Sequence, residues 1–520
     1  MAQRVLAVSR TTGAGAAALA LVLFLAIGTL AAVAFRAEGV GGFGPADWSA
    51  LRFTVIQATL SAALSVAFAI PIGRAFARRR FAGRGLLVML LGAPFILPVI
   101  VAVFGLISVF GRSGIVSQAL IALGLEPISI YGFHGVVLAH VFFNLPLATR
   151  LILQGWLAIP AERFRLAASL GMSSRDVSRH LERPMLRDVV PGAFLVIFLL
   201  CLTSFAVALA LGGGPRATTI ELAIYQAFRL DFDLGKAALL ALVQFALGAT
   251  VALVALRVAL PSGFGSGLDR AVTRWDANTR GLQALDAALI TLATLFLVLP
   301  MAMIAVDGLP ALLSLPASVF FATLRSLGVA LASVVLTLSL ALPIAAWSVR
   351  SGSRLVEGIG TLTIAASPLV IGTGLFVVIF PIADPFALAL PVTAAVNAVM
   401  SLPFALRALV PALRQVEGDY GRLADGLGMT GFARFRLLWI PRLRRPLGFS
   451  AGIAAALSMG DLGVIALFAA PDTPTLPLQL YRLLSAYRMD DAAGAALILL
   501  ATSLALFWIF DRGGRVDADT

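Results

Sequence analysis

Residues 165–187 read RLAASLGMSSRDVSRHLERPMLR, and residues 422–444 read RLADGLGMTGFARFRLLWIPRLR. The two stretches are identical at 11 of 23 positions and begin 257 residues apart. Both contain several arginines, a glycine and a proline, although 60% of the whole chain is hydrophobic. We call them the first and the second basic segment. Their repetition indicates that the chain around them is organised in two similar halves.

The composition is typical of a membrane protein. The chain has 520 residues, a mean hydropathy of +0.99 and only 12% charged residues, whereas about a quarter of the residues in a soluble domain are charged. Apolar runs of about 20 residues recur, and each is long enough to cross a bilayer as a helix. The runs do not alternate with polar residues, which favours helices over the strands of a membrane barrel. The sequence therefore predicts an all-α polytopic membrane protein with about 12 transmembrane helices.

The expected spans lie at about residues 13–35, 51–73, 86–110, 131–153, 191–213, 236–256, 282–305, 325–348, 357–381, 387–406, 447–470 and 491–510. With the N-terminus inside, 30 of the 39 Lys and Arg residues fall on the cytoplasmic side, as the positive-inside rule requires. This distribution predicts that both termini are cytoplasmic. Membrane topology and contact with lipid headgroups therefore explain the net charge of +13. Nucleic acid is not an expected partner.

Shorter matches keep their order along the two halves. IPI at 70–72 matches LPI at 342–344, and LPLA at 145–148 matches LPFA at 402–405. Ordered matches of this kind predict an internal duplication. Since each copy contains six spans, an even number, the two copies are parallel and both basic segments face the cytoplasm. Parallel duplications occur in transporters whose pathway lies between two equivalent halves.

We accordingly expect three parts. The first repeat covers residues 1–256, with a cytoplasmic loop at about 154–190. A polar cytoplasmic linker follows at 257–281. The second repeat covers residues 282–520, with its loop at about 408–446.

Each basic segment is expected to form two short helices around a glycine. In the first segment Gly171 interrupts the helix, Ser173 or Ser174 caps the next one, and Pro184 ends it. The second segment has the same elements at Gly428, Thr430 and Pro441.

An apolar stripe distinguishes the second segment, because Phe432, Phe435 and Trp439 follow helical spacing. The stripe either enters lipid or docks into a groove of a partner protein. The alternative is that both segments only fix topology and bind anionic headgroups.

The two segments resemble the cytoplasmic EAA loop of ABC-transporter permease subunits, whose pattern is EAA, three residues, Gly, nine residues, then I-x-L-P. Gly171 with Pro184, and Gly428 with Pro441, keep this spacing. The sequence departs from the pattern at the glutamate, which is Arg165 or Arg422, at the first alanine, which is leucine in both copies, and at the residue before Pro184, which is arginine. Residues 137–154 and 460–488 further resemble the fused, double-domain permeases of bacterial thiamine transporters, and fused iron(III) permeases share the 12-span plan.

The resemblance implies a type I importer fold in the bacterial inner membrane. It implies that each EAA-like loop docks into an ATPase subunit, so that two copies of a cytoplasmic ABC ATPase bind one chain. A periplasmic substrate-binding protein would deliver a small-molecule substrate, thiamine or its phosphates. The residues assigned to the ATPase contact are Arg165, Ala167, Gly171, Met172, Arg179, Leu181 and Pro184 in the first segment, and Arg422, Ala424, Gly428, Met429, Phe432, Phe435, Arg436, Leu438, Trp439 and Pro441 in the second.

The chain shows no nucleotide-binding motif. Its single lysine, Lys236, lies in LGKA and not in a Walker A pattern. We therefore expect ATP and Mg²⁺ to bind a separate ATPase chain, no cofactor or metal on this one, and no enzyme activity of its own. The lone Cys201 allows no intramolecular disulfide, and the three histidines form no metal-ligand cluster.

Several polar residues fall within expected spans. Asp461 either faces the translocation path, where it attracts a cationic substrate, or caps a broken helix at Gly460-Asp461-Leu462-Gly463. Ser204 occupies the corresponding position of the first copy. His140, Asn144 and Asn397 belong either to the pathway or to polar links between packed helices.

Two alternatives of other classes remain at this point. A secondary transporter with six plus six spans is favoured by the basic stretch RAFARRRFAGR at 74–84, but that fold does not require paired Gly-to-Pro segments. A scaffold membrane protein predicts no substrate flux.

Overall fold

The computed structural model describes residues 2–37, 42–92, 96–212, 214, 217–257, 275–277, 279–353, 356, 367–470 and 472–515. Among these residues helices predominate and no β-strand occurs. Eleven of the described helices are long and apolar enough to cross a membrane. The chain is therefore an all-α polytopic membrane protein, as the composition predicts. Its backbone polar groups are satisfied within helices, which a bilayer requires.

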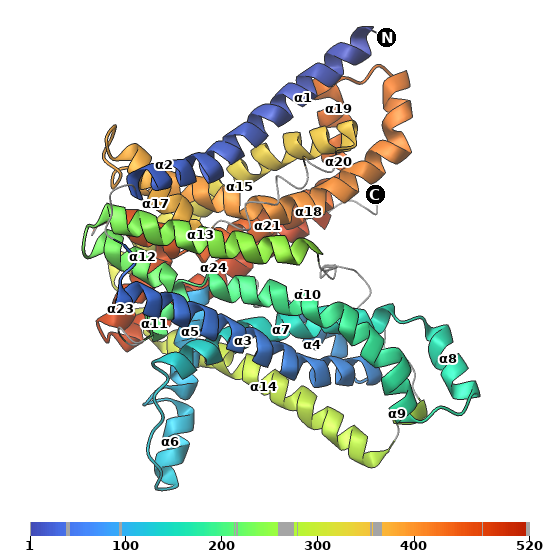
Figure 1. Cartoon of the computed structure of the whole chain (residues 1–520), viewed down its shortest axis with the longest axis vertical. Helices are drawn as coiled ribbons and strands as arrows, with labels where there is room; N and C mark the ends of the chain where they lie inside the picture. Colours follow the sequence, from blue (N-terminus) through green and yellow to red (C-terminus); the bar gives the residue numbers. More distant parts are fainter. Residues whose placement is uncertain are drawn as a thin grey trace.

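In chain order the helices of Figure 1 are α1 (Ala2–Leu23), α2 (Thr29–Ala37), α3 (Pro45–Arg78), α4 (Arg84–Leu90), α5 (Val99–Phe110), α6 (Ile115–Ala122), α7 (Phe133–Ala158), α8 (Ala161–Ser169), α9 (Ser174–Val177), α10 (Arg183–Leu202), α11 (Ala206–Leu211), α12 (Ile220–Arg229), α13 (Leu234–Arg257), α14 (Arg280–Ala311), α15 (Ala317–Ser351), α17 (Pro368–Ile379), α18 (Ala389–Gly426), α19 (Gly431–Arg434), α20 (Ile440–Arg442), α21 (Arg444–Met459), α22 (Gly463–Phe468), α23 (Leu476–Ser485) and α24 (Met489–Arg515).

Most expected spans coincide with these helices, and four differ. The spans expected at 191–213 and 447–470 are each interrupted, between α10 and α11 and between α21 and α22. The span expected at 86–110 is wrong in detail, because α4 ends at Leu90 and a separate helix, α5, begins at Val99 after Pro98. The proline lacks the N–H that a continuing helix needs. The span expected at 357–381 begins outside the described residues, and its described part is the 12-residue helix α17. Most of the expected linker at 257–281 also lies outside the described residues.

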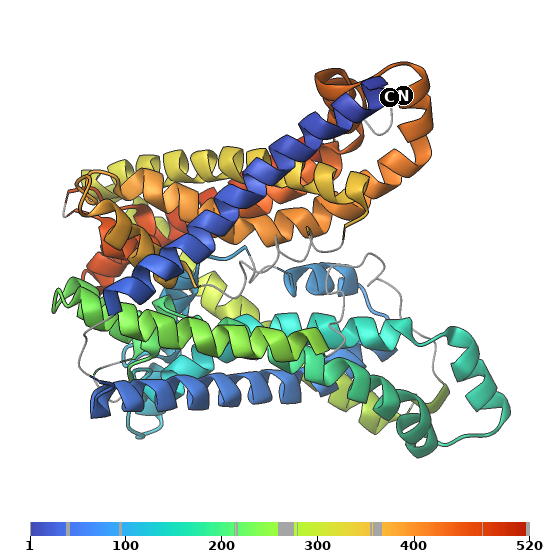
Figure 2. The same ribbon diagram turned by 45° about the horizontal axis from the view of Figure 1, so that its top comes forward.

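The first helices of each sequence half pack against helices of the opposite half as well as against one helix of their own half, α13 for α2 and α24 for α14. Helix α1 lies along α15, and α2 lies against α17 and α13. Conversely, α14 lies against α3, α5 and α24. Figure 2 shows α1, in dark blue, beside the yellow helix α15, and the yellow-green α14 among the blue and cyan helices of the N-terminal half. We call α1–α2 and α14 the exchanged helices.

Each exchanged helix crosses its partner at a glycine. A Cβ atom added to Gly105 of α5 would lie 2.5 Å from the carbonyl oxygen of Pro300 in α14. A Cβ atom added to Gly374 of α17 would lie 2.6 Å from the carbonyl oxygen of Thr29 in α2. Glycine therefore permits these backbones to approach as closely as small residues do in many membrane proteins.

A buried ion pair also holds one exchanged helix. Arg79 Nε, just beyond α3, lies 2.8 Å from Asp286 Oδ2 in α14, and the Asp286 side chain is almost fully buried. A carboxylate at this depth is stable only with a cationic partner. The pair therefore fixes α14 to the N-terminal half.

Both basic segments lie at one end of the molecule. In Figures 1 and 2, α8 and α9 occupy one corner of this end, and α19 and α20 occupy another. Helix α1 starts and α24 finishes at the same end. We call it the basic end and the other one the opposite end.

Candidate functional site

The glycines of the two basic segments adopt the same left-handed turn. Gly171 has φ +63° and Gly428 has φ +65°. In each turn the amide that follows the glycine donates a hydrogen bond to a carbonyl oxygen five residues earlier. Met172 N donates to Ala167 O at 3.0 Å, and Met429 N donates to Ala424 O at 2.9 Å. This is the Schellman arrangement that ends helices, and its left-handed residue is usually glycine. The predicted interruption at both glycines is confirmed.

The predicted ends of the second helices at Pro184 and Pro441 are wrong. Helical structure continues through both prolines, into α10 and through α20. A π-helical turn precedes each proline, at Ser178–Glu182 and at Phe435–Trp439. Such a wide turn accommodates a residue that has no N–H and whose ring would crowd the preceding turn of a regular helix.

The capping predictions differ between the copies. Ser173 caps α9, since its hydroxyl accepts a hydrogen bond from Asp176 N at 3.4 Å and the Asp176 carboxylate accepts one from Ser173 N at 3.1 Å. Thr430 occupies the N-cap position of α19 but makes no side-chain capping bond.

The helices that lead into the two turns also differ. In the first copy Ile159 and Pro160 separate α7 from the nine-residue helix α8. In the second copy no break occurs, and α18 runs for 38 residues from Ala389 to Gly426. The expectation of two short helices around the glycine is therefore wrong for both copies: only the helix before the glycine is short in the first copy, and only the helix after it is short in the second. Pro160, with no proline at the matching place in α18, explains the break.

The candidate docking residues fall into two groups. The exposed group consists of Arg165, Gly171, Arg179, Pro184, Arg422, Gly428, Phe432, Arg436 and Pro441. The buried or half-buried group consists of Ala167, Met172, Leu181, Ala424, Met429, Phe435, Leu438 and Trp439. The first group is available to a partner, while the second packs the segments onto the bundle.

The apolar stripe of the second segment is only partly exposed. Phe432 is 72% exposed, whereas Trp439 is 6% exposed and points to the bundle. The rings of Phe435 and Trp439 meet edge to face at 6.4 Å. Of the three stripe residues, Phe432 is thus the one that presents its ring to a partner.

Two leucines at matching places of each segment belong to the exposed surface and are absent from the predicted docking residues, and the second segment also exposes Leu437. Leu166 and Leu170 are 60% and 68% exposed, and Leu423 and Leu427 are 60% and 63% exposed. Each pair lies one helical turn apart just before the glycine. The same two leucines occur at matching positions of both segments, and this repetition was the sequence signal that could have revealed them. Exposed leucines outside the spans indicate a surface that another protein covers.

Buried charges attach each segment to the bundle. Glu182 of the first segment is 2% exposed and accepts hydrogen bonds from Arg74 of α3 at 3.1 Å and Trp156 of α7 at 3.4 Å. Neither partner was predicted.

In the second segment the buried charge is a cation. Arg434 is 4% exposed, donates to Glu417 Oε1 at 3.0 Å and lies 2.6 Å from Asp425 Oδ1. Burial opposes its charge, but the hydrogen bonds and negative charges of these carboxylates outweigh burial and raise the pKa of Arg434. The guanidinium is therefore held in its charged form.

In the N-terminal half the candidate pathway residues lie among α3, α7 and α10. His140 Nδ1 is 3.5 Å from Ser61 Oγ, and Asn144 donates to Cys201 Sγ at 3.3 Å. Both side chains are buried. Ser204 lies in the break between α10 and α11 and is half-buried.

The C-terminal half has a similar arrangement among α15, α18 and α21. Asn397 donates to Ser458 Oγ at 3.1 Å, and Ser458 Oγ is 3.0 Å from Ser333 Oγ. Asp461 lies in the break between α21 and α22, where its carboxylate accepts a hydrogen bond from Gly463 N at 3.2 Å. The structure therefore gives these residues links between helices and, for Asp461, a capping bond.

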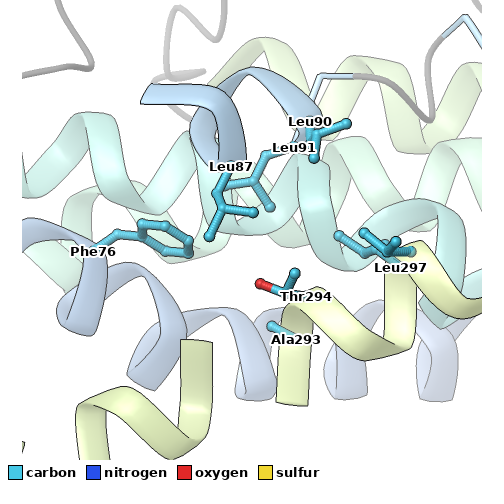
Figure 3. Close-up of a pocket in the computed structure, with 8 residues that line it drawn as sticks. Phe76, Leu87, Leu90, Leu91, Ala293, Thr294 and Leu297 are labelled. Carbon is cyan, nitrogen blue, oxygen red and sulfur yellow. The ribbon is translucent and has the colours of Figure 1, made fainter. Parts of the chain in front are cut away.

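Two cavities differ greatly in size. An apolar cavity of about 20 Å³ lies between α3, α4 and α14, and Figure 3 shows Phe76, two leucines of α4 and Leu91 just after it facing Ala293, Thr294 and Leu297. It has room for about one water molecule and is too small for an organic substrate.

The larger cavity, of about 330 Å³, lies at the opposite end, beside the start of α18. Its lining includes the Asp384 carboxylate, Phe386, Pro391 and Thr473. This volume is within the range of small-molecule sites. We call it the outer cavity.

Comparison with known proteins covers nearly the whole chain. It is 41% identical to the thiamine transport system permease protein of Brucella abortus over 515 residues, 96% of this chain and 94% of the relative. It is 40% identical to that of Escherichia coli over 487 residues, 91% and 90% of the two chains. The Haemophilus influenzae protein is 34% identical over 88% and 87%.

A more distant relative is the trehalose/maltose transport system permease protein of Thermococcus litoralis, 27% identical over 218 residues, 40% of this chain and 72% of the relative. No family model matches the chain. Because the identity to the first group extends over at least 88% of the chain, and the fold is polytopic and helical, the chain belongs to the family of thiamine transport system permease proteins, the fused, double-domain permeases of ABC transporters.

Proposed function

We propose that this chain forms the membrane pathway of an ABC importer for thiamine or its phosphates. The observation that carries the proposal is 41% identity along 96% of the chain to a thiamine transport permease. Exposed leucines in the two basic segments support it, because a permease needs a docking surface for its ATPase.

The two basic segments are the docking sites. Each presents an exposed leucine pair before a left-handed glycine, Leu166 with Leu170 and Leu423 with Leu427. Since one chain carries two such sites, two ATPase subunits bind it.

The topology follows from the position of the basic end. If ATPase subunits dock there, this end is cytoplasmic, and so are both chain termini, in a bacterial inner membrane. The parallel six-span repeat, with its boundaries at 256 and 282, is supported by equivalent helix pairings, since α3 packs on α7 as α15 packs on α18.

ATP and Mg²⁺ bind the ATPase subunits, and the chain itself is not an enzyme. Lys236, its single lysine, lies in α13 and its Nζ is 3.3 Å from Asp47 Oδ1. Because this ion pair already engages the single lysine, its ammonium group is not available to a nucleotide phosphate.

A periplasmic binding protein delivers the substrate at the opposite end. The stretches 214–235 and 471–490 serve as its docking sites, and the outer cavity lies next to the second of them. The Asp384 carboxylate and the Phe386 ring suit a cationic aromatic molecule such as thiamine.

Reconstitution of the chain with its ATPase and binding protein tests the proposal. We expect uptake of labelled thiamine that requires both partners and ATP. Uptake of ferric ion instead would retain the importer and change the substrate. Uptake driven by an ion gradient without ATP would favour a secondary transporter, and no flux at all would favour a scaffold.

A further inference from the structure

Each basic segment is held by a tryptophan, a glutamate and an arginine whose places are exchanged between the two copies. The first cluster consists of Glu182 of the segment, Trp156 of α7 and Arg74 of α3. The second consists of Trp439 and Arg434 of the segment and Glu417 of α18. We propose that these clusters are positioning contacts that transmit the displacement of the docked segments into the membrane helices, a role that rests on the proposed function.

The exchange is matched in position on the side of the segments, whereas Trp156 of α7 and Glu417 of α18 stand at places that differ by four residues between the copies. Glu182 and Trp439 are 257 residues apart and occupy the same place in the two copies. Where the first segment supplies the carboxylate, α7 supplies the indole. Where the second supplies the indole, α18 supplies the carboxylate. In both clusters the indole Nε1 donates to a glutamate Oε1, at 3.4 Å from Trp156 and at 2.6 Å from Trp439.

Burial separates these contacts from ordinary surface ion pairs. Glu182 and Arg434 are 2% and 4% exposed, although the Arg74 side chain is 30% exposed. A buried charge that loses its partner is strongly unfavourable, so the contact resists separation. Exposed pairs contribute little and open easily.

Each cluster also reaches the second long helix of its half. Arg74 lies near the end of α3, and Arg350, near the end of α15, places its guanidinium 5.6 Å from the centre of the Trp439 ring. Helices α3 and α15 form extensive packing with α7 and α18. A basic segment that is attached near the ends of these long helices cannot slide along the bundle. When the segment moves, α3 with α7, or α15 with α18, therefore moves with it.

The test uses the chain reconstituted with its ATPase and binding protein. Glu182→Gln and Glu417→Gln keep the size of the side chain and remove the charge. Three quantities are measured: ATPase bound, ATP hydrolysed and thiamine taken up per ATP. We expect binding and hydrolysis to persist and uptake per ATP to fall by roughly threefold to tenfold. The control is Asp511→Asn, which removes an ion pair between Asp511 and Arg515 within α24 and leaves all three quantities unchanged.

Charge exchange supplies the rescue. The variant Arg74→Glu alone lowers uptake per ATP, and Arg74→Glu with Glu182→Arg restores most of it. Uptake per ATP equal to the unaltered protein in both glutamine variants overturns the proposal. Loss of ATPase binding by Glu182→Gln also overturns it, because the residue would then belong to the docking surface.

Cross-linking tests the same idea without altering charge balance. Cysteines at positions 74 and 182, in a chain with Cys201→Ser, are joined by a short thiol-specific reagent. The cysteine pair lacks the ion pair, so uptake per ATP is expected to be low before cross-linking and to recover once the two positions are joined. Uptake that stops on cross-linking contradicts the proposal. If the unaltered chain shows no ATP-dependent thiamine uptake, the proposed function fails. If the unaltered chain takes up thiamine and both glutamine variants equal it, the function stands and the positioning role fails.

Discussion

The crossings of the exchanged helices allow a quantitative prediction. In Gly105→Ala the new methyl group would lie 2.5 Å from the Pro300 carbonyl oxygen, and in Gly374→Ala it would lie 2.5 Å from Thr29 Cβ. Both distances are about 1 Å shorter than ordinary contact, and the obstacles include backbone atoms that cannot rotate away. Overpacking of this kind costs about 1–3 kcal/mol. Alanine gains about 0.5–1 kcal/mol over glycine inside a helix, so each variant loses up to about 2.5 kcal/mol net.

A matched control separates packing from helix propensity. Gly328 lies inside α15, and a Cβ atom there meets nothing within 4 Å. Gly328→Ala is therefore expected to be neutral or more stable by up to about 1 kcal/mol. The assay is the temperature at which half of the detergent-solubilised protein is lost from its gel-filtration peak, compared at one heating time because unfolding of such proteins is often irreversible. If the variants at Gly105 and Gly374 are as stable as Gly328→Ala, the close crossings do not exist as described.

Three further predictions concern transport. Gly428→Ala strains the left-handed turn by about 1–2 kcal/mol and should lower ATP-driven thiamine uptake several-fold, measured in proteoliposomes, while Gly418→Ala in the middle of α18 should not. Asp461→Asn keeps an acceptor for Gly463 N, so unchanged uptake identifies a helix cap, and loss of uptake identifies a charge needed by the substrate. Leu423→Ser should reduce the amount of ATPase that copurifies with the chain by about tenfold or more, since a buried leucine contributes about 1.5–3 kcal/mol; undiminished copurification would place the docking surface elsewhere.

The membrane fold was largely predictable from the sequence because lipid imposes a simple rule on length and polarity. Runs of about 20 apolar residues must be helical, and the span at 131–153 accordingly falls within α7. The rule fails where a helix is broken inside an apolar run, because no polar residue marks the break. Leu90 and Val99 lie in one such run, yet Pro98 separates two helices there.

The basic segments were predictable in their turns and less so in their contacts. Gly171 and Gly428 need a conformation that few other residues adopt, and a glycine repeated between copies reveals it. Pro184 predicts a helix end, but the helix continues through it. Sequence patterns give no sign of the π turn at Ser178–Glu182 that allows this. The bond between Arg74 and Glu182 joins residues 108 positions apart, and no periodicity connects them.

Helix α18 gives the C-terminal half a lever that the N-terminal half lacks. It runs without interruption from Ala389, which lines the outer cavity, to Gly426, which leads into the turn of the second basic segment. At 1.5 Å per residue it is about 57 Å long, nearly twice the thickness of the hydrocarbon layer. A small tilt imposed at one end therefore displaces the other end directly. In the N-terminal half α7 ends at Ala158 and Pro160 separates it from α8, so no single helix joins the first basic segment to the opposite end.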